Sequence, residues 1–132
     1  MEEELRAMLL GMADLGVRVG TRVDWDKRSQ GDALPAIALH LKASVRPMNL
    51  AGPGVWARGL VQMDCWGRQH KDARDLAEMI ARPVAAGGIH GFRGTRSGIR
   101  LRVWALSIAN DTDTDAKGVV HRARLDCRVW WS

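Results

Sequence analysis

The segment "VVHRARLDCRVWW", residues 119–131, gives the clearest indication of how this chain folds. Its charged side chains fall at positions 122, 124, 126 and 128, and mostly small or apolar side chains occupy the positions between them. Alternation with a period of two residues is typical of a β-strand that buries one face and exposes the other. The segment therefore predicts a strand whose buried side carries Val119, Ala123, Leu125, Cys127 and Val129.

Three other segments, 36–43, 55–66 and 99–108, alternate in the same way. Each places apolar side chains on one side and polar or charged ones on the other. Together with 119–131 they predict four strands of one sheet with a single buried face. The segment 20–34, which precedes them, is predicted to be an irregular arm.

Two helices are predicted from apolar residues at helical spacing. One lies near the N-terminus around Leu5 and Leu9, and the other runs from Ala73 to Val84 between the second and third strands. Pro83 should end or kink the second helix, because proline lacks a backbone N–H and disfavours helical geometry in the preceding residue. The order α-β-β-α-β-β predicts an α+β fold, a four-stranded, mainly antiparallel sheet with helices on one face.

Length and charge narrow the class of protein. A chain of 132 residues suits one domain, residues 1–132. Lys and Arg number 20 against 15 Asp and Glu, which favours an acidic partner but equally suits a subunit contact or a solvated face. No segment approaches the roughly 20 apolar residues of a membrane span, and the N-terminal residues lack a signal-peptide pattern. We expect no membrane partner and a protein that stays in the cytoplasm where it is made.

Cys65 is the first candidate for chemistry, because His70 follows it in "VQMDCWGRQHKDARDL", residues 61–76. Cys65 shares the predicted buried side of its strand with apolar neighbours, and Cys127 occupies a matching position on the last strand. A reactive cysteine needs an electropositive, partly exposed setting, so both thiols are predicted to be core residues. Two cysteines and four dispersed histidines also lack the spacing of zinc ligands.

Two further motifs resemble ligand-binding loops only in part. Asp111, Asp113 and Asp115 in "NDTDTDAKG", residues 110–118, match the first positions of a calcium loop, but the required Gly and Glu are absent, so an exposed connection between strands is predicted. The segment "GGIHGFRGTRSG", residues 87–98, lacks the lysine of a phosphate-binding loop and is predicted to be a flexible connection. No catalytic, metal-binding or cofactor-binding residue is predicted, and we expect neither a cofactor nor an enzyme.

The polar side of the predicted sheet is rich in arginine. It carries Arg58, Arg100, Arg102, Arg122, Arg124 and Arg128, with Asp64 and Asp126 among them. Such a face could contact neighbouring subunits, bind nucleic acid, or be solvated. Sheets that bind RNA interleave aromatic residues with the charges, and Trp104 is the only aromatic residue predicted squarely within this face, so a subunit interface fits better than a nucleic-acid surface.

Several short motifs lie along the chain in an order and spacing that resemble those of a known family. They are Gly20-Thr21-Arg22-Val23, Leu34-Pro35-Ala36, Val61-Gln62-Met63-Asp64 with Trp66, the helix with Ala73, Leu76 and Ala77, Gly91-Phe92-Arg93-Gly94, His121-Arg122, and Asp126 with Val129-Trp130. Across nearly its whole length, the chain resembles the tail-completion or tail-terminator proteins of siphophages and gene transfer agents.

The resemblance implies a structural virion protein. Subunits of this kind form a ring, usually a hexamer, that caps the head-proximal end of the tail tube, stops its growth and meets the head connector. The implied partners are other copies of the chain, the major tail tube protein and the head connector or stopper protein, with DNA only passing through the channel. The implied location is the head-proximal end of the virion tail, after assembly in the host cytoplasm. The alternative is a small nucleic-acid-binding module that uses the arginine-rich face.

The resemblance also makes the arm around Trp25 and the loops 44–56 and 110–118 candidate contacts with neighbouring subunits or rings. Arginines that faced the channel would hinder passage of DNA, so most are expected at subunit contacts. The residues expected at an interface are Arg22, Trp25, Arg58, Asp64, Arg100, Arg102, Asp111, Asp113, Asp115, Arg122, Arg124, Asp126 and Arg128.

Overall fold

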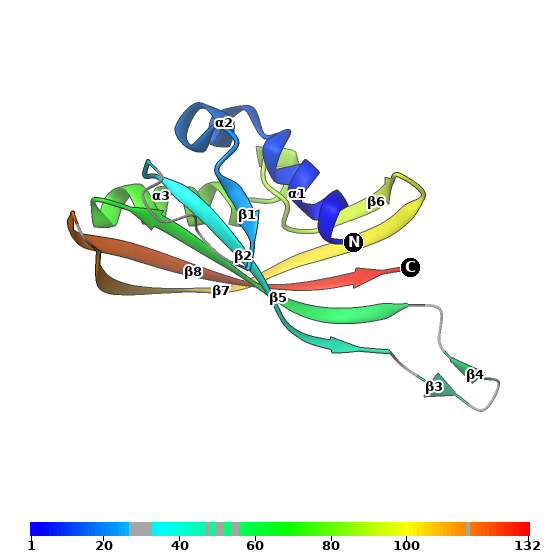
Figure 1. Ribbon diagram of the computed structural model, residues 1–132. Coiled ribbons are helices and arrows are strands. Elements are labelled where there is room, and N and C mark those ends of the chain that lie inside the picture. Colours follow the sequence, from blue (N-terminus) through cyan, green and yellow to red (C-terminus); the bar gives the residue numbers. More distant parts are fainter. Residues whose placement is uncertain (27–32, 47, 50–51, 54–55, 116) are drawn as a thin grey trace.

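The computed structural model describes residues 1–26, 33–46, 48–49, 52–53, 56–115 and 117–132 (Figure 1). Parts of the predicted arm and of the predicted 44–56 loop lie outside the described residues. In chain order the elements are α1 (Glu2–Leu10), α2 (Ala13–Val19), β1 (Val23–Trp25), β2 (Ala36–Val45), β3 (Met48–Asn49), β4 (Gly52–Pro53), β5 (Ala57–Gly67), α3 (His70–Ala81), the 3₁₀ turn η1 (Val84–Ala86), β6 (Phe92–Arg96), β7 (Ile99–Asp115) and β8 (Gly118–Trp131).

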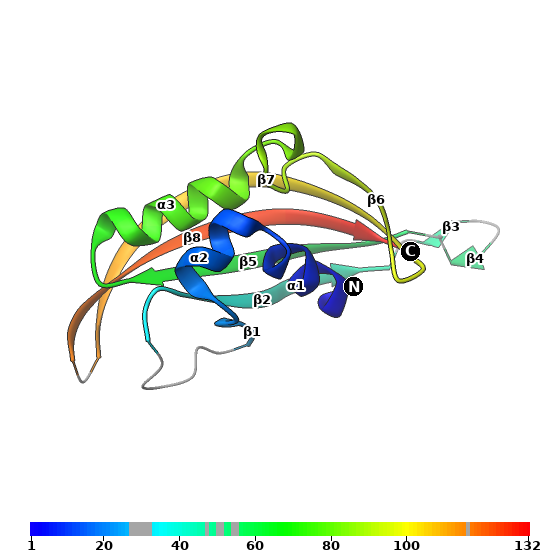
Figure 2. The same cartoon turned by 90° about the horizontal axis from the view of Figure 1, so that it is seen from above.

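The main sheet has six strands in the order β1-β2-β5-β8-β7-β6. Strand β1 pairs in parallel with β2, whereas the other neighbouring strands are antiparallel, and β3 and β4 form a separate small hairpin. The sheet is mixed and curled like half of a barrel, with the three helices on one side (Figures 1 and 2).

The predicted fold class is therefore wrong. The sheet is not a four-stranded, mainly antiparallel one with the order α-β-β-α-β-β, because two additional strands and one additional helix complete the fold. Strand β1 has three residues and β6 has five, which is too short for alternation to stand out in the sequence. The segment 87–98, predicted to be a flexible connection, contains β6 and the turn at Ser97 and Gly98 that leads into β7.

The hydrophobic core lies between the helices and the inner face of the sheet. Leu5 and Leu9 of α1 and Leu76 and Ile80 of α3 are fully buried against strand residues such as Met63. Burying one large apolar side chain stabilises a fold by about 1.5–3 kcal/mol, so these helices hold the curled sheet in place. Helix α3 ends at Ala81, two residues before Pro83, so proline ends the helix as predicted. Val84, predicted within the helix, lies in η1 instead.

Strands β2 and β7 each contain a β-bulge, between Leu41 and Ala43 and between Ala105 and Ser107. One extra residue reverses the faces of the residues that follow it. In β7, the side chains on the face away from the helices are therefore the even-numbered ones up to Trp104 and the odd-numbered ones from Ser107 onward. We call this face, opposite the helices, the outer face.

The last two strands form a long hairpin where the sequence predicted a loop. Pairing continues to Asp115 and Gly118, so most of the segment 110–118 is strand rather than an exposed connection. Val119 shares the side of Ala123 and Leu125, as predicted, but it is 56% exposed, so the prediction that it is buried is wrong. The other four residues predicted on the buried side of this strand are buried.

Candidate interaction surface

The outer face is built by the alternation of β5, β8 and β7. Arg58, Gln62, Asp64 and Trp66 of β5 lie beside the even-numbered residues of β8, from Arg122 to Trp130. In β7 the bulge brings Asp111 opposite Arg122, although Asp111 has the opposite parity to Arg102. The three helices pack on the other side of the sheet (Figure 2), which leaves this face available for contacts with other molecules.

Asp64 lies at the centre of a polar cluster on this face and is the one buried polar or charged residue recorded among the described residues, with 3% exposure. The Gln62 amide donates a 2.7 Å hydrogen bond to Asp64 Oδ1, and Asp64 Oδ2 lies 3.2 Å from His40 Nε2. The Arg122 guanidinium is 3.6 Å from the same oxygen. A buried carboxylate needs such partners because burial without them is costly, so Asp64 fixes the positions of side chains from β2, β5 and β8.

Asp111 forms the second half of this cluster. Arg122 donates two hydrogen bonds to its carboxylate, one of 2.9 Å from Nε to Oδ1, and Arg124 Nε lies 3.7 Å from Oδ2. The hydrogen bond from Arg122 holds the pKa of Asp111 below its ordinary value. The same hydrogen bond, together with the charge of Asp64, raises the pKa of Arg122. Asp64 and Asp111 thus pair with Arg122 within the subunit.

The other end of the outer face is an arginine–tryptophan cluster. Arg100 and Arg102 lie 4.5 and 4.9 Å from the centre of the Trp56 ring, and Arg58 lies 5.5 Å from the centre of the Trp130 ring. Trp130 also meets Trp104 edge to face, with 5.6 Å between ring centres. Cation–π contacts of this kind contribute about 0.5–1 kcal/mol each at exposed sites. Within the described residues no carboxylate pairs with these arginines, so their charges remain available to a partner.

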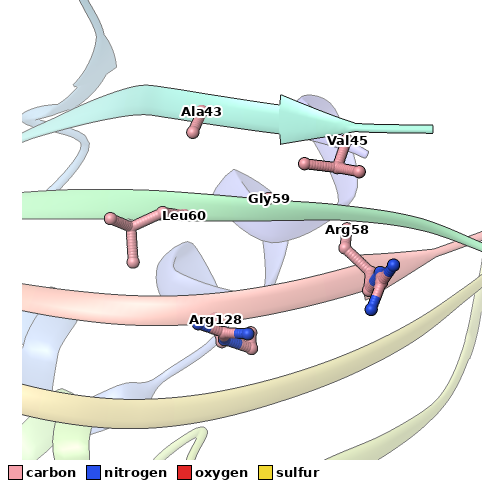
Figure 3. Close-up of a pocket in the computed structure, with 6 residues that line it drawn as sticks. All are labelled: Ala43, Val45, Arg58, Gly59, Leu60 and Arg128. Carbon is pink, nitrogen blue, oxygen red and sulfur yellow. The ribbon is translucent and has the colours of Figure 1, made fainter. Parts of the chain in front are cut away.

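A shallow depression of about 290 Å³ lies on this end of the face (Figure 3). Ala43 and Val45 of β2 and Leu60 of β5 give it an apolar floor, and Arg58 and Arg128 stand beside it. Val45 is 53% exposed, which makes it one of the few large apolar side chains that the subunit leaves open to solvent. The depression combines apolar surface with positive charge, as a protein contact site does.

The two thiols lie on the opposite face, within the core. Cys65 and Cys127 are fully buried, as predicted. Burial raises the pKa of Cys65 far above its ordinary value and that of Cys127 to about 12. Neither thiol can supply a thiolate near neutral pH, and among the described residues no three His, Cys, Asp or Glu side chains gather as metal ligands. None of the described helices is long and apolar enough to span a membrane.

Comparison with known families places these features in context. The sequence model of the family described as "Tail completion protein gp17" matches residues 3–132, which is nearly the whole chain. The chain belongs to this tail completion family. Its members are structural components of phage tails, and the family resemblance seen in the sequence is confirmed.

Solved structures share the fold of this tail completion protein. A chain in the virion of a native gene transfer agent particle is similar, with a TM-score of 0.73 and 18% sequence identity over 99% of this chain and 93% of that chain. A second solved structure has a TM-score of 0.59 and 18% identity over 100% of this chain and 96% of that chain. No curated protein sequence matches.

Most of the residues predicted at an interface gather on the outer face of this tail completion protein. Arg22 and Trp25 do not. The Arg22 side chain donates hydrogen bonds to the backbone oxygens of Pro35 and Arg18, and the Trp25 indole donates a 3.0 Å hydrogen bond to the backbone oxygen of Glu2. Both side chains therefore already serve contacts within the subunit. The others on the outer face are Arg58, Asp64, Arg100, Arg102, Asp111, Asp113, Arg122, Arg124, Asp126 and Arg128.

The Asp115 side chain lies outside the described part of the chain. The expectation that Trp104 is the only aromatic residue of the outer face is wrong, because Trp66 and Trp130 lie there too and Trp56 stacks on two arginines. Continuing the two-residue alternation to the strand ends would have found Trp66 and Trp130. His40 and Gln62 sit at outward positions of the predicted strands, but only the fold shows that they meet Asp64.

Proposed function

We propose that this tail completion protein forms a closed ring of identical subunits, usually six in this family, at the head-proximal end of the tail tube. The ring ends growth of the tube and joins the tail to the head connector. It works by binding alone, as one domain spanning residues 1–132, without a cofactor and without catalysis. Its partners are other copies of itself, the major tail tube protein and the head connector or stopper protein. It assembles in the host cytoplasm.

The observation that carries this proposal is a charged outer face on a chain of the tail completion family. In a closed ring every subunit presents one patch to one neighbour and a different patch to the other. Arginines without an acidic partner in the subunit suit such heterologous contacts, because a neighbour's carboxylates can pair with them. We therefore assign the outer-face arginines that lack an acidic partner in the subunit to subunit contacts, and expect the channel, through which DNA passes, to carry few of them.

Deleting the gene from its parent phage or transfer agent tests this function. Electron microscopy of the lysate should show DNA-filled heads beside unattached, overlong tails, and a plasmid copy of the gene should restore joined particles. Normal, infectious particles from the deletion strain would refute the proposal. A structure of the ring with the arginine-rich face lining the channel would refute the assignment of these residues to subunit contacts.

A second function, nucleic-acid binding, gains support from the interleaving of arginine with Trp56, Trp104 and Trp130, because RNA-binding sheets combine these residue types. Arg100 and Arg102 both lie against the Trp56 ring, however, and so compete with a base for its surface. Titration of labelled single-stranded DNA at several salt concentrations separates the two functions. Binding that weakens steeply with salt would favour a nucleic-acid module, whereas no binding at moderate salt favours the ring.

A further inference from the structure

Strand β7 is the outermost strand of the sheet over most of its length. Strand β6 pairs only with its first part, from Ile99 to Val103, and no other described segment pairs with that side of β7 from there to Asp115. Figure 1 shows β7 running from β6 to the end of the β7–β8 hairpin. This side of β7 is therefore an open sheet edge, on which another extended chain can pair.

The alternation of the strand determines which backbone groups this edge exposes. The Ala105 backbone donates a 3.0 Å hydrogen bond to His90 Nδ1, so Ala105 directs its N–H away from β8. In an antiparallel pair every second residue directs its N–H and C=O to the same side, and the bulge after Ala105 shifts this order by one residue. The N–H and C=O groups that point to the open side are therefore those of Ile108, Asn110 and Thr112.

Side-chain hydrogen bonds close the two ends of this edge. His90 accepts the hydrogen bond from Ala105 at one end, and Asp113 Oδ1 accepts a 2.8 Å hydrogen bond from the Thr114 backbone at the other. Each satisfies an N–H group that has no strand partner in the described chain. We call residues 107–112, between these two contacts, the open edge. It has room for a partner strand of about six residues, a common strand length.

The open edge lacks the features that commonly protect sheet edges from pairing, which are charged side chains, proline and bulges. Other edges of the sheet have them: β2 has a bulge at the exposed Lys42, and β6 carries the exposed Arg93 and Arg96. In contrast, the bulge of β7 precedes the open edge, and residues 107–110, Ser-Ile-Ala-Asn, include neither a charged residue nor a proline. The next residue, Asp111, is held by Arg122 on the outer face.

A shallow depression of about 320 Å³ lies at the start of the open edge. Its lining includes Ala81 at the end of α3 and Leu106 and Ile108 of β7, with His90 among them. Leu106 is 52% exposed, so the subunit alone leaves this apolar surface in water. When a peptide adds a strand to a sheet edge, main-chain hydrogen bonds provide affinity and pockets for its side chains provide specificity. The depression therefore suits an apolar side chain of an added strand.

We propose that the open edge receives an extended segment of a different virion protein, which pairs with Ile108, Asn110 and Thr112 and places an apolar side chain in the depression. The inference rests on the proposed function, since the donor is a partner in the assembled tail. A second copy is a poorer donor, because its β2 and β6 edges are protected and two paired β7 edges would be related by a two-fold axis, which a head-to-tail ring lacks. A nucleic acid lacks the alternating N–H and C=O groups that pair with a strand.

Replacing Asn110 by proline tests the added strand. Asn110→Pro removes an N–H from the open side and none that faces β8, a position where edge strands tolerate proline. Asn110→Val is the matched control, because it keeps the N–H and suits a strand. The proline variant should reduce the yield of joined particles roughly tenfold or more, whereas the valine variant should assemble like the wild type.

Urea unfolding of the purified subunits shows whether the proline variant folds. A folded proline variant that assembles normally, or an equal loss of yield in both variants, would overturn the proposal. A second measurement decides the matter where the proline variant does not fold.

That measurement is photo-cross-linking, which also identifies the occupant. Photoreactive benzoylphenylalanine replaces Ala109, an exposed outer-face residue of the open edge, in subunits expressed beside the wild-type chain so that particles assemble. The same label at the exposed Lys71 of α3 is the control. Irradiation of purified particles should join position 109, and not position 71, to a segment of another virion protein.

The outcomes separate the inference from the function on which it rests. An adduct only with a second copy, at twice the 14.6 kDa subunit mass, an adduct only with nucleic acid, or no adduct would overturn the added strand and leave the tail role intact. The proposed function fails instead where deletion of the gene still gives normal, infectious particles.

Discussion

Replacing Asp64 by alanine removes the carboxylate at the centre of the outer face. The wild-type side chain is 3% exposed and accepts a 2.7 Å hydrogen bond from Gln62, with His40 at 3.2 Å and Arg122 at 3.6 Å. The substitution leaves three polar groups to find other partners. Its cost depends on how many of them can do so.

The structure limits this cost. A hydrogen bond to a charged group contributes about 1.5–3 kcal/mol, and breaking a buried ion pair costs about 3–5 kcal/mol when it leaves a buried charge without a partner. Here Arg122 keeps Asp111, and Gln62 and His40 are partly exposed, so water can replace Asp64 at both. We therefore expect Asp64→Ala to lower the free energy of unfolding by about 2–3 kcal/mol, nearer the single hydrogen bond than the full ion pair.

Urea unfolding followed by tryptophan fluorescence measures this loss. At a slope of about 1–3 kcal/mol per M, the midpoint should fall by roughly 0.7–3 M with the slope unchanged. Asp126→Ala is the matched control, because Asp126 is an aspartate on the same face without a hydrogen bond or ion pair among the described residues. It should change stability by no more than about 0.5 kcal/mol. Equal midpoints for the two variants would refute the role of Asp64.

Three further predictions concern titration, thiol reactivity and backbone packing. The contact that lowers the pKa of Asp111 stabilises the fold at pH values above the ordinary value near 3.8, and this stabilisation is lost as the pH falls through the lowered pKa. Asp111→Asn should therefore destabilise the protein by about 1 kcal/mol or less at pH 6, and by progressively less as the pH falls through the lowered pKa. Cys65 and Cys127 should react with a thiol reagent only after unfolding, as a time course with and without urea would show. Gly88→Ala should destabilise the fold by about 2 kcal/mol in the urea assay, because the new Cβ would lie 2.1 Å from the backbone oxygen of Arg82. Gly16 lies in α2 with open space around it, so Gly16→Ala should stabilise the fold by about 0.5–1 kcal/mol in the same assay.

The sequence predicted the long strands because their alternation records which face meets the core. Met63 and Cys65 in β5, and Leu125 and Cys127 in β8, are buried at the predicted positions. The helix α3 was predicted for the same reason, with a period of 3.6 residues instead of two. These patterns arise because some side chains are buried and others are not, so they can be recognised in the sequence without knowing which elements pack together.

Short elements and bulges leave no comparable pattern. Strand β1, from Val23 to Trp25, gains its order from the parallel pairing with β2 and from the Arg6 side chain, which donates to the Val23 oxygen. The segment with Asp111 and Asp113 contains residues that are poor strand formers, yet pairing with β8 and the Arg122 contact hold it as a strand. Tertiary contacts determined these elements, and single-sequence patterns do not contain them.

The candidate surface was predicted in composition more than in arrangement. The arginines of β5, β7 and β8 do share one face, since period-two positions on neighbouring strands share a side of the sheet. The sequence alone did not predict which of these arginines pair with a carboxylate. The bulge near Ser107 sets the register that places Asp111 opposite Arg122. The arginines at the opposite end have no carboxylate partner in the described chain.

The bulge in β7 has a consequence for how related chains can differ. Leu106 is the extra residue between Ala105 and Ser107, and it is 52% exposed. A chain without it would show uninterrupted alternation along β7 and could keep every pairing with β8, but it would lose the local bend and the added twist that a bulge imposes. The local curvature of the sheet at this point thus depends on the number of residues in β7 rather than on which side chains they carry. Relatives could vary the radius of the half-barrel by gaining or losing one residue while their buried contacts stay the same.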